Sequence, residues 1–267
     1  MNLAQTLDRF DQIGSLARTS TPAPDVETGL TIMEAVSHVA GIPLSERPSC
    51  TSVLLAKFVS DWADDLDDVE RDRLLIPLVP HLVGAHRVNR DFFGHLALAW
   101  LLRDALPAWL RVAGFDDAAK FETSLPAPNS PAAIAAWSDE LGALGRFIPH
   151  VLGNEFGDEL GGIEIARQVL PRLRSTGEAA AAAVVEDLFG PGSPLAMLAD
   201  RALTICHLAA CLGCARAAKA AVAAARGGDL ELAAAAAVAR TYEPARIARQ
   251  LSALGLVDRM TARRISA

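Results

Sequence analysis

Three side chains near the start of the chain have the types and spacing of an acid–base and nucleophile set. Glu34 and His38 are four residues apart, so on a helix they share one face, where they could share a proton or a metal ion. Cys50 is expected to open the next helix, whose positive dipole end favours a thiolate. Glu34, His38 and Cys50 are therefore the candidate catalytic residues. The alternative is structural, because Thr31 and Glu34 also form a capping-box pattern at a helix start.

A run of acidic residues, Asp64-Asp65-Leu66-Asp67-Asp68, offers hard oxygen ligands for a divalent cation. It resembles the aspartate-rich motif with which class I terpene synthases hold magnesium and a diphosphate. This resemblance implies a metal site at Asp64, Asp65 and Asp68, with Mg²⁺ as its cofactor. The second metal motif of those enzymes has no good match in this sequence. The alternative is a solvated turn in which Asp67 and Glu70 cap the following helix.

Soft ligands recur once, at His207, Cys211 and Cys214, which follow one stripe of a predicted helix. Three ligands on one straight helix are spread along about 10 Å of its axis, so they seldom converge on a single ion. The alternative is that the cysteines are small buried hydrophobes. Three cysteines within nine positions, counting Cys206, are not a secreted disulfide framework, which favours a reducing cytoplasm.

The composition of the 267 residues favours helices as the elements that carry these side chains. Hydrophobic residues make up 51% of the chain, and much of this apolar fraction is alanine. Aromatic residues make up only 5%. Alanine is the best helix former, and its small side chain lets helices approach closely. No period-2 alternation typical of strands persists. The sequence predicts an all-α, irregular multi-helix bundle, with N-terminal helix pairs that resemble a helical repeat.

Apolar periodicity and turn residues divide this bundle into its elements. Helices are expected at 3–18, 31–40, from 51, from 68, 91–112, 132–152, 163–189, 194–226 and 229–258. Pro107 is expected to kink the helix that contains it. The proline-rich segment 124–131 is the best linker candidate. It predicts an N-terminal helical subdomain over 1–123 and an alanine-rich C-terminal subdomain over 132–267, packed together as one domain.

One block resembles a family of uncharacterised actinobacterial proteins that share the letters MEAVAYVAGEP followed by Ser, Pro and Cys. The matching letters here are Ile32–Gly41 (IMEAVSHVAG), Pro43, Ser45, Pro48 and Cys50, then Trp62–Asp65 and Arg73–Pro77. The resemblance covers residues 30–110, and more loosely the alanine-rich C-terminal part. It implies no activity. Glu34 and Cys50 match the family, whereas its residue at the position of His38 is aromatic and its matching turn is not an aspartate run.

The charge balance bears on partners. The net charge is −7 and the isoelectric point about 5.4, which argues against nucleic acid as a partner because phosphates require clustered cations. No signal-type or membrane-spanning apolar run is evident, so no membrane partner is expected. The leading hypothesis is a helical protein-interaction or self-assembling protein whose partner is another protein or a second copy. The alternative is an enzyme or small-molecule binder with a pocket between helices and, at the aspartate run, magnesium.

Overall fold

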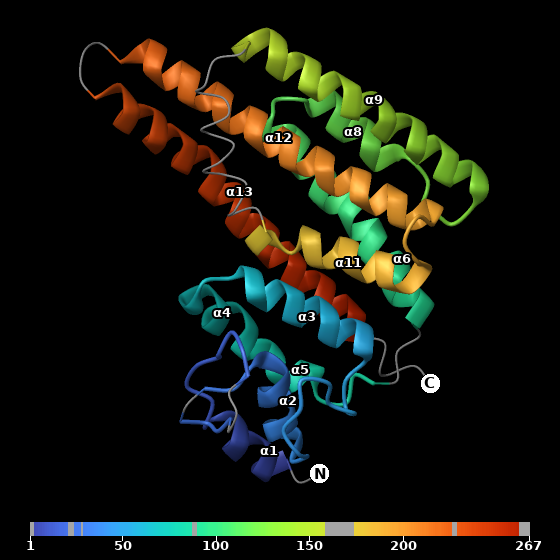
Figure 1. The fold of residues 1–267 in the computed structure, drawn as a ribbon, viewed down its shortest axis with the longest axis vertical. Helices are drawn as coiled ribbons and strands as arrows, with labels where there is room; N and C mark the ends of the chain where they lie inside the picture. Colours follow the sequence, from blue (N-terminus) through green and yellow to red (C-terminus); the bar gives the residue numbers. More distant parts are fainter. Residues whose placement is uncertain are drawn as a thin grey trace. The chain divides into compact units, whose positions relative to one another are not determined.

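A computed structural model gives the fold of this chain. It describes residues 3–20, 24–27, 29–86, 90–157, 174–225 and 229–261. Throughout these residues the protein is built from helices and has no β-strand. Two isolated β-bridges, Leu16 with Leu30 and Thr51 with Ala85, are the extent of extended pairing there. The predicted all-α, irregular multi-helix fold is confirmed (Figure 1).

The chain forms two compact units. Unit 1 comprises Met1–Leu96 with Ala253–Ala267, and unit 2 comprises Ala97–Ser252. The segment 124–131, predicted to be a linker, therefore lies inside unit 2. It packs against helices of that unit. Nε1 of the buried Trp137 donates to the carbonyl oxygen of Pro126 (2.8 Å), and Nη2 of Arg103 donates to that of Leu125 (2.6 Å).

Unit 1 is built from short helices. They are α1 (Leu3–Phe10), α2 (Ile32–Ala40), α3 (Val53–Asp65), α4 (Asp68–Leu75), a 3₁₀ turn (Ile76–Leu78), α5 (Val79–Leu82) and the start of α6 (Arg90–Trp100). Helix α2 has the predicted capping box. The Thr31 hydroxyl accepts from the Glu34 amide (3.3 Å), and Oε2 of Glu34 accepts from the Thr31 amide (2.9 Å). Gly41 ends the helix in the left-handed conformation (φ 69°).

The first helix is shorter than the predicted 3–18. The amides of Gln12 and Ile13 bond to carbonyls three residues back, which tightens and ends the helix after Phe10. The chain then extends, and the amide of Ala17 donates to the carbonyl oxygen of Leu30 (2.9 Å). Ile13 and Leu16 are three residues apart and buried, but they belong to an extended segment, so a spacing typical of a helix did not indicate one here.

Arg71, a buried cation of α4 that is 1% exposed, reaches the extended segment, because its Nη1 donates to the carbonyl oxygen of Leu16 (3.4 Å). Its guanidinium donates to the carbonyl oxygens of Ala63 (3.0 Å) and Leu66 (2.8 Å) and pairs with Asp68 (2.8 Å). On the same helix Asp72 accepts from the amide of Leu16 (2.7 Å). These contacts hold the chain after α1 against the α3–α4 turn.

Unit 2 is organised around α12 (Pro194–Ala224), which packs on α7 (Leu106–Val112), α9 (Pro131–Phe156) and α11 (Glu178–Phe189) (Figure 1). The unit also contains α8 (Asp116–Ser124) and most of α13 (Leu230–Thr261). A Cβ at Gly213 of α12 would overlap the backbone carbonyl of Val112, so α12 and α7 meet through small residues, as the alanine content predicts. The predicted helix over 163–189 lies outside the described residues up to position 173.

Pro107 lies near the start of α7. It has no amide hydrogen, and the preceding residues Leu101–Ala105 form a π-helical turn in place of a simple kink.

Helix α12 is the one described helix that is long and apolar enough to cross a membrane. In its most apolar window 56% of the residues are buried inside the protein, a pattern that core helices of soluble proteins share.

Candidate functional site

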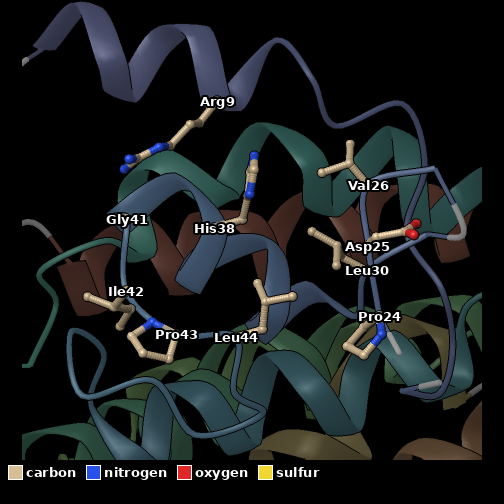
Figure 2. A pocket seen from close by; sticks show the side chains of 10 residues that line it. All are labelled: Arg9, Pro24, Asp25, Val26, Leu30, His38, Gly41, Ile42, Pro43 and Leu44. Carbon is tan, nitrogen blue, oxygen red and sulfur yellow. The ribbon is translucent and has the colours of Figure 1, made fainter. Parts of the chain in front are cut away.

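An open recess of about 410 Å³ lies in unit 1 (Figure 2). Its polar lining consists of Arg9 from α1, His38 from α2 and Asp25 from the loop before α2. The remaining walls are apolar or backbone, from Pro24, Val26, Leu30, Gly41, Ile42, Pro43 and Leu44. The recess therefore combines apolar walls with few charged groups, the usual make-up of a small-molecule site.

The wall over residues 41–44 is fixed by the end of α2. Gly41 turns the chain, and its amide and that of Ile42 bond to the carbonyl oxygens of His38 (3.0 Å) and Ser37 (3.1 Å). The buried Ser37 hydroxyl bonds to the carbonyl oxygens of Met33 (3.0 Å) and Ser45 (3.2 Å). These bonds tie the loop after α2 back onto the helix, so this wall is held in place without a ligand.

His38 and Arg9 approach each other from neighbouring helices. Figure 2 shows the imidazole rising from α2 toward α1, and the Arg9 side chain descending from α1 toward Gly41. Nε2 of His38 lies 3.1 Å from Oε1 of Gln12. Partial burial lowers the pKa of His38 below its ordinary 6.5, and the charge of Arg9 lowers it further. A hydrogen bond with the backbone of Arg9 raises this pKa, but by less. The imidazole is therefore mainly neutral at pH 7.

Arg9 is a half-buried cation, and no carboxylate of the described residues forms an ion pair with it. Its guanidinium occupies the space beside Gly41, where a Cβ would overlap it. Asp25 lines the recess on the far side from Arg9 in Figure 2. The wall formed by α1 and the end of α2 thus presents one positive charge and one titratable imidazole.

The structure gives the three predicted catalytic residues separate partners. Glu34 is buried in its capping box and also accepts from the Ser20 hydroxyl. Cys50 lies before Ser52, the N-cap of α3, with its sulfur 3.8 Å from the Thr51 hydroxyl. In the part of the chain that is described, no hydrogen bond joins Glu34, His38 and Cys50 to one another. Of the three, His38 lines the recess.

The aspartate run forms the turn between α3 and α4. Asp67 caps α4 by accepting from the Glu70 amide (2.8 Å), as predicted, and Asp68 pairs with Arg71. The side chain of Asp64 is exposed as a whole, yet partial burial of its carboxylate and the nearby Asp61 raise its pKa. Among the described residues no three His, Cys, Asp or Glu side chains are grouped so that they could hold a metal ion. The structure thus does not gather Asp64, Asp65 and Asp68 into a magnesium site.

The cysteines of α12 are core residues. Cys206, Cys211 and Cys214 are buried. Burial raises the pKa of Cys211 to about 11. The pKa of Cys214 is raised to about 12, mainly by burial and also by the neighbouring Cys211. Both therefore stay protonated at neutral pH, and neither is set up as a thiolate ligand or nucleophile.

Unit 2 holds a buried polar cluster that no pattern in the sequence indicates. Glu178 is 1% exposed, and its carboxylate accepts from Nε1 of Trp109 (3.0 Å) and from the Thr176 hydroxyl. Burial raises the pKa of Glu178, although both hydrogen bonds lower it. Tyr242 stacks on Trp109 with ring centroids 6.1 Å apart, and in the described structure its buried hydroxyl has no hydrogen-bond partner. These residues are far apart in sequence and match no motif, so no local signal could have found them.

Comparison with known proteins adds no identification: the chain matches no protein-family model, no curated protein and no solved structure. The resemblance of residues 30–110 to actinobacterial proteins stays an expectation.

Proposed function

We propose that this chain is a binding protein whose unit 1 holds a small molecule with an apolar body in the recess. The observation that carries the proposal is the volume of about 410 Å³ with mainly apolar walls. Small-molecule sites typically have volumes of about 300–1,000 Å³ and such walls. A ligand that buries apolar surface there would gain roughly 25 cal/mol per Å² removed from water.

The lining favours binding over covalent catalysis. The described walls carry one guanidinium, one imidazole and one carboxylate, but no hydroxyl or thiol nucleophile. Glu34 and Cys50 do not line the recess, so neither reaches a ligand held there as the chain is folded here. The loop that forms one wall is already fixed by Ser37 and Gly41, so a ligand would not need to order it.

Titration with N-phenyl-1-naphthylamine, an uncharged dye that fluoresces in apolar surroundings, tests the proposal. We expect saturable binding that Ile42→Asp weakens at least tenfold, because this change places a charge on the apolar wall. Val69→Asp is the matched control, since Val69 is a 78% exposed apolar residue of α4 outside the recess. Equal affinity in wild type, Ile42→Asp and Val69→Asp would contradict the proposal.

A second candidate is the helical interaction or self-assembly function expected from the sequence. It is favoured by α13, where Ile247 (41% exposed) and Leu251 (59% exposed) are one turn apart on the same face. Exposed apolar faces of this kind often contact another protein. Light scattering tests it: we expect a dimer or larger species that the double change Ile247→Asp, Leu251→Asp dissociates. A protein that stays monomeric at all concentrations would contradict self-assembly as the function.

A further inference from the structure

We infer that the ligand of the recess carries a carboxylate, which Arg9 binds directly and which the imidazole of His38 attracts when it is protonated. This inference rests on the proposed function, because it names the ligand class of the same recess. It starts from the Arg9 guanidinium, which lies on the wall of the recess and forms no ion pair with a carboxylate among the described residues.

Arg9 lies half-buried on α1, beside Gly41. A half-buried guanidinium normally pairs with a carboxylate, and none of the described carboxylates forms an ion pair with Arg9. Nor does a side-chain hydrogen bond use its donors in the described part of the chain. The planar fork of a guanidinium matches a carboxylate with two parallel N–H···O bonds, which makes that group the best counterpart.

The competing explanation is that Arg9 only neutralises the C-terminal end of α2. Cations do favour that end, because the last carbonyl oxygens there lack helical donors. Here, however, the amides of Gly41 and Ile42 already donate to the carbonyl oxygens of His38 and Ser37. The end of α2 is thus largely satisfied by its own cap, and the guanidinium remains able to bind a ligand.

His38 supplies the second part of the site. Its ring faces Gln12 and the backbone of Arg9 on α1, and Asp25 lines the recess beyond it. It therefore acts on a ligand through charge more than through contact. In the free protein the pKa of His38 lies below 6.5, since burial and the Arg9 charge disfavour its protonated form. A bound carboxylate would offset the Arg9 charge and favour protonation, so binding should tighten as the pH falls through the range in which His38 becomes protonated.

The test uses three probes that share one ring system and displace the naphthylamine dye from the full-length protein. They are 2-naphthoate, the uncharged 2-naphthalenemethanol and the cationic 2-naphthylmethylammonium. At pH 7 we expect the carboxylate to bind about tenfold more tightly than the alcohol, and the ammonium least tightly. Arg9→Gln should remove this tenfold preference while leaving the alcohol unchanged. Arg73→Gln, which removes an exposed charge of α4 outside the recess, should leave the preference intact.

The outcomes separate the inference from the proposed function. Equal binding of the carboxylate and the alcohol, both weakened by Ile42→Asp, would overturn the inference and leave the function standing. Tighter binding of the ammonium would also overturn it, because Asp25 would then dominate the recess. If the dye and all three probes fail to bind, the proposed function falls and the inference with it.

Discussion

The guanidinium of Arg9 occupies the space that a side chain at Gly41 would fill. Gly41 also has φ 69°, the left-handed conformation that closes α2 and that side chains disfavour. One glycine thus meets two requirements, because it ends a helix and admits a cation to the wall of the recess. The two requirements can be separated by experiment.

Gly41→Ala is expected to lower the free energy of unfolding by about 1 kcal/mol through backbone strain. It should also push the guanidinium aside, so the affinity for 2-naphthoate falls while that for 2-naphthalenemethanol is kept. Gly192→Ala is the control, since Gly192 has φ 77° and open space where its Cβ would lie. Competition titrations and urea unfolding measure the two effects. An unchanged carboxylate preference in Gly41→Ala would contradict the placement of Arg9.

Glu178→Gln is expected to stabilise unit 2 at high pH. Burial raises the pKa of Glu178 in the folded state, so its stabilising contribution is present below the unfolded pKa of about 4.3 and declines as the pH rises. Glutamine stays neutral and still offers Trp109 an acceptor. Urea unfolding of both proteins should give similar stability at pH 4 and a more stable variant at pH 8. A variant less stable than wild type at pH 8 would show that the ionised carboxylate is favourable.

Tyr242→Phe removes a buried hydroxyl that has no hydrogen-bond partner in the described structure but keeps the ring that stacks on Trp109. We expect the free energy of unfolding to rise by about 1 kcal/mol, because the desolvation cost of the hydroxyl disappears. Ser252→Ala is the contrasting variant, since the Ser252 hydroxyl accepts from Nε1 of Trp100 (2.8 Å). It should lose about 1 kcal/mol. Loss of stability in both variants would mean that Tyr242 has a partner.

Arg71→Met should destabilise unit 1 by about 2–4 kcal/mol. It removes the two hydrogen bonds that the buried guanidinium donates to the carbonyl oxygens of Ala63 and Leu66, and its ion pair with Asp68. Arg73→Met, on the exposed side of the same helix, should change stability by no more than about 0.5 kcal/mol. Thermal and urea unfolding monitor both variants. A loss in Arg71→Met no larger than in Arg73→Met would remove Arg71 from its structural role.

Local signals in the sequence predicted the helices best where both ends carry a cap. Helix α2 matches its predicted range because Thr31, Glu34 and Gly41 specify its two ends. Where periodicity stood alone, as in the predicted 3–18, it could not distinguish a helix from a buried extended segment. The long alanine-rich helices were located well, since helix propensity summed over many residues outweighs a proline such as Pro149.

The candidate site was harder to predict because its parts come from different segments. His38 was singled out, but for a pairing with Glu34 and Cys50 that the contacts do not show. Its neighbour Arg9 is 29 residues away in sequence and has no motif around it. The apolar walls, Pro43 and Leu44 among them, lie in loops whose packing depends on the tertiary fold.

Hydrogen exchange of the full-length protein, with and without saturating N-phenyl-1-naphthylamine, tests the binding recess most directly. We expect slower amide exchange over residues 38–44, which form one wall of the recess, and no change around Ile247 and Leu251. Protection around Ile247 and Leu251, with residues 38–44 unchanged, would contradict the account and place the apolar binding surface on α13.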